Sequence, residues 1–175
     1  MRSDSIQKLR QSIRPIADFP KKGIQFHDIT PLLSDPALFK KSILLFKKLI
    51  KSKVDYVISV ESRGFMFGSA LAYALGAGFV PVRKQGKLPA KTFSQSYDLE
   101  YGSAAVEIHT DSIRKGARVV IMDDVLATGG TVGAVVCLVN KFDAKIVGAF
   151  FLIELTALGG RKKLKGLPVH SLITY

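Results

Sequence analysis

Two adjacent carboxylates followed by a turn rich in glycine and threonine are the residues of this 175-residue chain best suited to chemistry. Asp123 and Asp124 follow an apolar run, and residues 127–131 read Ala-Thr-Gly-Gly-Thr. A buried strand, such a turn and a helix start form an anion site, because successive backbone N–H groups and the helix dipole point at one spot. Thr128 and Thr131 add hydroxyl donors. The paired carboxylates need other partners, and either ribose hydroxyls or a magnesium ion would suit them.

The spacing within this stretch separates it from other phosphate-binding loops. A Walker A loop has Gly-Lys-Ser/Thr after its first glycine, and this stretch does not. The dinucleotide-binding pattern Gly-x-Gly-x-x-Gly is also absent from it. A hydrophobic run, Asp-Asp, a short spacer and Thr-Gly-Gly-Thr resemble the phosphoribosyl pyrophosphate motif of the type I phosphoribosyltransferases. The resemblance predicts a ligand with a sugar, a phosphate and a metal ion.

A second strand–turn–helix pattern lies at residues 57–65, where an apolar run leads into Glu-Ser-Arg-Gly-Phe. Backbone N–H groups and the fork of Arg63 suit a diphosphate. Further stretches resemble the adenine phosphoribosyltransferases within the type I family, and the match runs from about residue 13 to the C-terminus. These stretches are 18–26, 61–65, 82–89, 97–102 and 153–156.

The resemblance implies a reaction of purine salvage, in which adenine and phosphoribosyl pyrophosphate give AMP and pyrophosphate. It assigns Glu100, Arg63, Asp123 and Asp124 as catalytic residues, with Glu100 handling the adenine N7 proton or positioning the base. Magnesium is the implied cofactor, held mainly through the substrate with Asp123 and Asp124 nearby. The implied substrate-binding residues are Ser62, Arg63, Gly64, Arg83, Lys84 and Lys87 for pyrophosphate, Asp123 and Asp124 for ribose, Ala127, Thr128, Gly129, Gly130 and Thr131 for the ribose phosphate, and Ile24, Gln25, Phe26, His27 and Leu155 for adenine.

The residue types fit this chemistry. Pyrophosphate gains negative charge as it leaves, so cations and backbone N–H groups stabilise it. The ribose passes through an oxocarbenium-like state, so nearby carboxylates are favourable. Adenine must lose a proton, which a carboxylate base accepts. A lid must exclude water, and we predict that residues 84–95 form a mobile loop that serves with the following hairpin.

His27 departs from the family pattern, which usually has arginine at this position. If its side chain contacts the bound base or the lid, adenine affinity would depend on pH near the ordinary histidine pKa of about 6.5. If only the backbone reads the base, affinity would be flat across pH.

Composition predicts a globular protein of one domain. The chain is long enough for a sizeable core, and 47% of its residues are apolar. Its single cysteine, Cys137, cannot form an internal disulfide, and we expect it to be a small core residue in a cytoplasmic protein. The N-terminus lacks the apolar core of a signal peptide, and no apolar run reaches the length of a membrane span.

The net charge of +12 is compatible with nucleic acid, a membrane surface or a polyanionic small substrate. Much of the excess lies on the polar side of an amphipathic helix that begins after Asp35. The basic cluster 161–165 has no interleaved aromatic residues, so it is a weak nucleic-acid signal.

Strands alternating with helices must position these residues. The pattern predicts an α/β fold, a central mostly parallel sheet flanked by helices, with ligands at the C-terminal strand ends. The domain spans residues 1–175, and residues 1–33 form an N-terminal helix and a hood over the base. We predict strands at 54–60, 79–83, 119–122, 145–154 and 169–174, helices at 6–13, from 36, at 64–75 and at 132–142, a loop at 15–28, and a hairpin of 97–100 with 104–109.

Two alternatives remain open from the residues alone. The first is a regulator of the same fold that binds nucleic acid and senses phosphoribosyl pyrophosphate, although the stretch before residue 18 is short for an added DNA-reading domain. The second keeps the enzyme but changes the base to hypoxanthine or guanine. The resemblance implies a homodimer with Arg83 near the interface, and no membrane or nucleic-acid partner.

Overall fold

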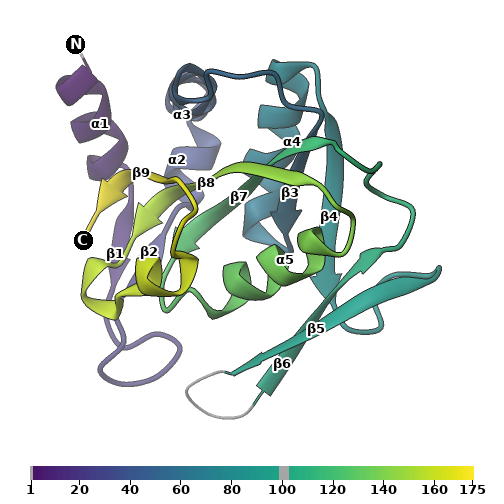
Figure 1. Ribbon diagram of the computed structural model, residues 1–175. Coiled ribbons are helices and arrows are strands. Elements are labelled where there is room, and N and C mark those ends of the chain that lie inside the picture. The colour runs from purple at the N-terminus through teal and green to yellow at the C-terminus, as the bar shows by residue number, and fades with distance from the viewer. Residues whose placement is uncertain (1, 99–102) are drawn as a thin grey trace. The chain divides into compact units, whose positions relative to one another are not determined.

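The computed structural model describes residues 2–98 and 103–175 (Figure 1). The chain divides into two compact units, Met1–Leu45 and Phe46–Tyr175. The larger unit holds the predicted phosphate-binding turns, and the smaller holds most of the predicted hood. The prediction that both form one functional domain stays a prediction.

The larger unit is built on a seven-stranded sheet with the strand order β5-β6-β4-β3-β7-β8-β9. Five neighbouring strands are parallel, and the hairpin β5-β6 joins antiparallel to β4. The predicted mostly parallel sheet is therefore confirmed. The strands are β3 (Tyr56–Val60), β4 (Gly78–Lys84), β5 (Thr92–Asp98), β6 (Ser103–His109), β7 (Arg118–Leu126), β8 (Lys145–Glu154) and β9 (Val169–Thr174).

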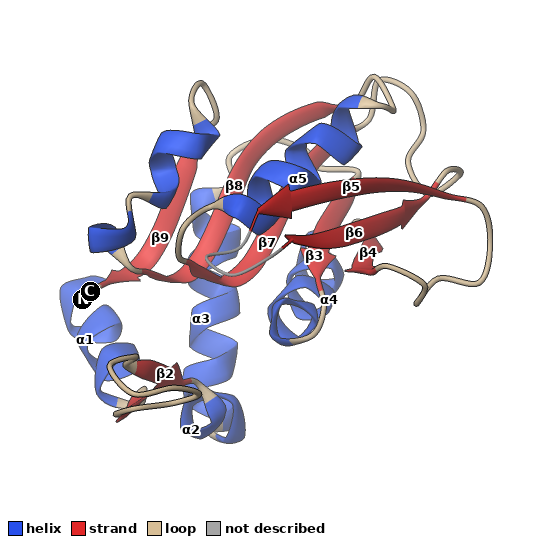
Figure 2. Ribbon diagram, turned by 90° about the horizontal axis from the view of Figure 1, so that it is seen from below, coloured by secondary structure: helices blue, strands red, loops and turns tan. Residues whose placement is uncertain are grey.

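Two helices cover opposite faces of this sheet (Figure 2). α4 (Arg63–Leu75) packs on β3 and β7, and α5 (Gly130–Asn140) packs on the other face and on the hairpin. Strands buried on both faces are mostly apolar, and β8 is buried from Gly148 to Glu154, with Glu154 as its one charged buried residue. Because β3 pairs in parallel with β7 between these helices, the C-terminal ends of the two strands lie side by side.

Local sequence signals explain where the helices begin and end. α4 ends at Gly76, whose φ of +64° is left-handed and whose N–H caps the helix. α3 (Pro36–Leu49) begins after Asp35, whose Oδ1 accepts the N–H groups of Ala37 at 2.8 Å and Leu38 at 3.0 Å. Both signals were predicted from the sequence.

The smaller unit contains a short two-stranded ribbon that the sequence did not predict. β1 (Arg14–Ile16) pairs antiparallel with β2 (Phe26–Asp28), inside the stretch expected to be a loop. Arg14 donates to Asp28 Oδ2 from Nε at 3.1 Å and from Nη2 at 2.6 Å. The unit also contains α1 (Arg2–Gln11), α2 (Thr30–Ser34) and the larger part of α3.

Two other expectations are wrong. Residues 84–95 are not a continuous loop, because β5 begins at Thr92 and pairs with His109 of β6. Cys137 is exposed and is not a core residue, because it lies on the face of α5 opposite to the buried Val132, Val135 and Val139. In the part of the chain that the structure describes, no helix combines the length and the apolar character that a membrane crossing requires.

Candidate active site

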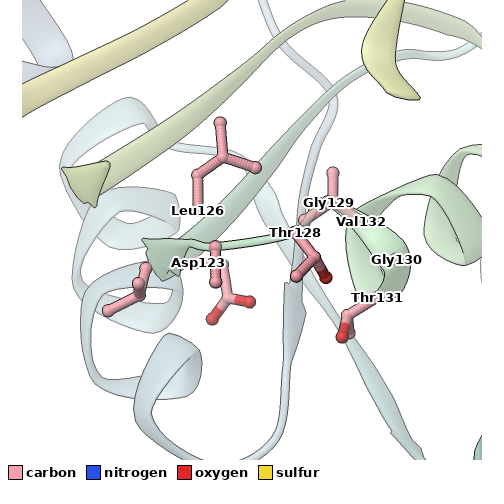
Figure 3. Close-up of a pocket in the computed structure, with 9 residues that line it drawn as sticks. Asp123, Leu126, Thr128, Gly129, Gly130, Thr131 and Val132 are labelled. Carbon is pink, nitrogen blue, oxygen red and sulfur yellow. The ribbon is translucent and has the colours of Figure 1, made fainter. Parts of the chain in front are cut away.

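The end of β7 and the start of α5 form a closed turn around a cavity. Only residues 127–129 join the two elements, and Gly129 has a φ of +78° that favours glycine. The cavity has a volume of about 70 Å³. Figure 3 shows the oxygen atoms of Asp123, Thr128 and Thr131 on one side of the turn and Leu126 on the other. The cavity is lined by Asp123, Val125, Leu126, Ala127, Thr128, Gly129, Gly130, Thr131 and Val132, which include every residue predicted for the ribose phosphate.

The two aspartates lie inside β7, and the Asp124 N–H donates to Asp123 Oδ1 at 2.9 Å. Asp123 lines the cavity, whereas Asp124 is buried and its Oδ2 lies 2.8 Å from Arg63 Nε. Burial raises the pKa of Asp123, and the neighbouring Asp124 carboxylate raises it further. Burial also raises the pKa of Asp124, against the opposing charge of Arg63. The pair therefore favours a bound cation or hydroxyl donors, which would stabilise its ionised form.

Strand pairing brings the second predicted turn to the same edge. β3 pairs in parallel with β7, and Ser59 Oγ donates to Met122 O at 2.6 Å. A methyl group at Gly64 would lie 2.6 Å from Asp123 Oδ1 and 2.9 Å from Ser59 Oγ. Only glycine allows the N-terminus of α4 to approach β7 this closely. Arg63 and Gly64 thus adjoin the two aspartates, with Ser62 as the N-cap residue of α4, and their role toward pyrophosphate stays a prediction.

The last two residues of β4, Arg83 and Lys84, and Lys87 in the turn that follows are the predicted cations, and two carboxylates hold this segment. Glu61 Oε2 accepts Arg83 Nε at 2.8 Å, and its Oε1 accepts the Lys84 N–H at 3.0 Å. Arg83 Nη1 donates to Lys87 O at 3.1 Å. Glu107, which is 8% exposed, accepts the N–H of Gly86 at 3.0 Å.

Charge complementarity keeps Glu61 ionised at this turn. Burial acts to raise the pKa of Glu61, but hydrogen bonds from Arg83 and the Lys84 N–H, with the charges of Arg83 and Lys87, lower it overall. Sequence reasoning placed Glu61 in a motif without a role and missed Glu107. Sequence spacing does not predict the contacts of Glu61 or Glu107, because each joins residues that are far apart in the chain.

The predicted adenine residues near the N-terminus lie in the smaller unit. Phe19 and Phe26 meet edge to face with ring centroids 5.1 Å apart, and Phe19 and Ile24 remain 50% and 44% exposed. This is an apolar surface suited to a flat ring. Gln25 is exposed, and burial lowers the pKa of the partly buried His27.

Two predicted residues lie elsewhere. Leu155 is in the larger unit directly after β8, and its N–H donates to Leu126 O at 2.9 Å, which ties it to the end of β7. Glu100 lies outside the described residues. The strands β5 and β6 form the predicted hairpin, and their pairing runs from Thr92 with His109 to Asp98 with Ser103.

Comparisons with known proteins agree with this geometry. Residues 28–169 match the model of the phosphoribosyl transferase domain family. An adenine phosphoribosyltransferase of Carboxydothermus hydrogenoformans is 55% identical over 168 residues, which are 95% of this chain and 99% of that protein. The chain belongs to the adenine phosphoribosyltransferase family.

Solved structures of adenine phosphoribosyltransferases match over almost the whole chain. That of Thermoanaerobacter pseudethanolicus has a TM-score of 0.95 and 52% identity, and covers 97% of this chain and 99% of its own. That of Saccharomyces cerevisiae, complexed with D-2,5-dideoxy-2,5-imino-altritol 1,6-bisphosphate and adenine, has a TM-score of 0.94, 43% identity and the same coverage. The predicted type I phosphoribosyltransferase fold is confirmed.

Family membership also decides between the alternatives. The chain is a phosphoribosyltransferase, and the predicted synthesis of AMP from adenine and phosphoribosyl pyrophosphate is confirmed. The comparisons therefore favour this function over a nucleic-acid-binding regulator and over an enzyme for hypoxanthine or guanine. The roles of single residues, the metal ion, the homodimer and the cytoplasmic location stay predictions.

Proposed function

We propose that this adenine phosphoribosyltransferase works through two adjoining anion sites that share the Asp123–Asp124 pair. The observation that carries the proposal is the position of the pair, because Asp123 lines the cavity of the turn 127–131 while Asp124 pairs with Arg63 at 2.8 Å. The cavity would take the ribose phosphate, and the Arg63 side would take the pyrophosphate.

The residues then divide the work of the reaction. The adenine N9 attacks C1 of the ribose, the bond from C1 to the pyrophosphate oxygen breaks, and the proton of adenine passes to Glu100. Arg63, Lys84 and Lys87 stabilise the negative charge that gathers on the leaving pyrophosphate. Asp123 and Asp124 stabilise the positive charge of the ribose ring.

Magnesium is the proposed cofactor, and the donor set suits it. Mg²⁺ is commonly held by one or two carboxylates together with substrate phosphates and water. Asp123 and Asp124 are two such carboxylates beside the proposed pyrophosphate position. When bound, the ion would neutralise charge on the leaving group.

The adenine site and the assembly rest on the resemblance together with exposed apolar side chains. In the smaller unit, Phe26 would stack on the adenine ring and Ile24 would contact the base, and the assignment of Leu155 in the larger unit rests on the resemblance alone. The proposed assembly is a homodimer. Met66 and Tyr73, seven residues apart on one face of α4, are 41% and 92% exposed, and this supports a partner on that face.

A base-competition assay tests the function. The protein would be incubated with phosphoribosyl pyrophosphate, magnesium and equal adenine, hypoxanthine and guanine, and the nucleotides separated by chromatography. We expect AMP alone. Formation of IMP or GMP would leave the phosphate-site assignments in place but would reject the assigned adenine pocket. Omitting magnesium should abolish turnover, and full activity with a chelator present would reject the metal.

A further inference from the structure

The basic cluster 161–165 has no part in the proposed chemistry, yet hydrogen bonds tie its first residue, Arg161, to two strands of the larger unit. Arg161 Nε donates to Glu154 Oε1 at 2.6 Å, and Nη2 donates to Glu154 Oε2 at 2.7 Å. Arg161 Nη1 donates to Val169 O at 2.9 Å. The Arg161 side chain is 49% exposed, but its guanidinium bridges the end of β8 and the start of β9.

The carboxylate of Glu154 is only 4% exposed and is fully engaged. Ser171 Oγ adds a third hydrogen bond at 2.6 Å to Glu154 Oε2. A buried carboxylate is tolerated when it is paired in this way, and a bidentate arginine also fixes orientation. Hydrogen bonds from Arg161, and more weakly from Ser171, lower the pKa of Glu154 against the effect of burial.

Glu154 lies beside the start of the turn 127–131, which we call the phosphate turn. It is the last residue of β8 and pairs in register with Leu126, the last residue of β7. The ion pair therefore ties the segment η2 (Gly160–Leu164) to the strand ends from which the turn 127–129 begins.

Gly160, the residue before Arg161, packs directly against that turn. A methyl group at Gly160 would overlap Ala127 O and lie 3.1 Å from Gly129 N. Reciprocally, a methyl group at Gly129 would lie 2.5 Å from Gly160 O. The two backbones leave no room for a side chain between them, so a shift of Gly160 shifts the turn.

We propose that Glu154, Arg161 and Ser171 are positioning residues that act through Gly160 to set the backbone of the phosphate turn. This inference rests on the proposed function, in which that turn binds the ribose phosphate. The network would therefore govern affinity for ligands with a 5′-phosphate, namely phosphoribosyl pyrophosphate and AMP. Affinity for pyrophosphate, which is bound on the Arg63 side, would not depend on it.

Calorimetry with two ligands tests the proposal. AMP and magnesium pyrophosphate would each be titrated into the full-length protein and into Arg161→Gln and Gly160→Ala. We expect both variants to bind AMP at least about tenfold more weakly and to bind pyrophosphate within about twofold of the parent. Lys163→Gln, an exposed neighbour with the same loss of charge, and Gly133→Ala, whose added methyl group meets nothing within 4 Å, are the matched controls and should bind as the parent does.

The outcomes separate this inference from the proposed function. Unchanged AMP affinity in Arg161→Gln, or equal losses for AMP and pyrophosphate, would overturn the positioning role. A parent protein that binds no AMP would instead reject the function. If Arg161→Gln fails to fold, Ser171→Ala removes one hydrogen bond and keeps the ion pair. A loss of about twofold to threefold for AMP alone is expected there, and no loss would overturn the inference.

Discussion

The two anion-binding sides of the site follow the same strand–turn–helix plan but are held in place by different contacts. Backbone packing holds the phosphate turn, where Gly129 and Gly160 meet without side chains between them. Ion pairs hold the pyrophosphate side, where Glu61 binds Arg83 and the Lys84 N–H. A packed backbone adapts little, whereas a turn held by side chains can rearrange when a highly charged ligand arrives and leaves.

The aspartate pair connects the two sides. Asp123 lines the phosphate cavity, and Asp124 pairs with Arg63. A change at the pair should therefore reach both ligands, whereas a change within one side should reach one. The predictions that follow separate these cases, starting with a residue that belongs to neither side.

Glu100→Leu should lower turnover by about 100-fold or more, because the proton of adenine loses its acceptor. Binding of phosphoribosyl pyrophosphate and of pyrophosphate should stay near the parental level, since Glu100 is assigned to neither anion. Single-turnover kinetics and calorimetry measure the two effects. A variant with near-parental turnover would remove the base role.

Gly129→Ala should weaken binding of phosphoribosyl pyrophosphate by about 100-fold, because alanine is strained at a φ of +78° and its methyl group meets Gly160 O. Pyrophosphate affinity should change little. Gly133→Ala lies one turn further along α5, with open space around the added methyl group, and should bind normally. Equal effects of the two substitutions would reject the packing argument.

Asp123→Asn and Asp124→Asn should each weaken magnesium-dependent binding of phosphoribosyl pyrophosphate by about tenfold to thirtyfold. Both should also weaken magnesium pyrophosphate, and Asp124→Asn should do so more strongly because Arg63 loses its charged partner. Titrations with each ligand, with and without magnesium, test the difference. If the double variant binds as the parent does, the ribose and metal assignment is wrong.

Glu61→Gln should weaken pyrophosphate binding by about fivefold and leave AMP binding unchanged, since Arg83 is partly exposed and exposed ion pairs contribute modestly. Asp111→Asn, at an exposed carboxylate after β6, is the control for the change in charge. A loss of AMP affinity equal to that of pyrophosphate would mean that the two sides are not held separately.

Lowering the pH should weaken the contribution of an ion pair to stability but not the contribution of backbone packing. Hydrogen bonds from Thr30, then from Arg14, lower the pKa of Asp28 to about 2, below its ordinary value of 3.8. The stability that ionised Asp28 contributes is therefore complete above about pH 4 and is lost as pH falls toward 2. The difference in Tm between the parent and Asp28→Asn should shrink over that range, whereas the difference for Gly129→Ala should not. Parallel Tm curves for Asp28→Asn would contradict the assignment.

Local patterns predicted most of the fold. The cap at Gly76 and the strands 145–154 and 169–174 were predicted at their observed positions, because each depends on residues next to it in the chain. β1 and β2 were missed because strands of three residues show no periodicity. The burial of Cys137 was predicted wrongly because α5 is apolar on nearly all sides, so its sequence does not show which face is exposed.

The candidate site divides in the same way. The phosphate turn and the residues 62–64 were predicted, since each is one continuous motif. Glu107 and Gly160 were not predicted, because their roles depend on strands and turns brought together from distant parts of the chain. Glycine spacing alone does not reveal which glycine faces another backbone.

The exposed thiol of Cys137 offers a direct way to observe the site. It is the single cysteine of a chain without tryptophan, and it lies on the helix that begins at Gly130, about 10 Å further along the axis. A fluorophore attached there, paired with a tryptophan introduced in place of Phe93 on β5, would give a distance signal from one dye and one tryptophan. Ligand binding could then be followed in real time on the unlabelled substrates.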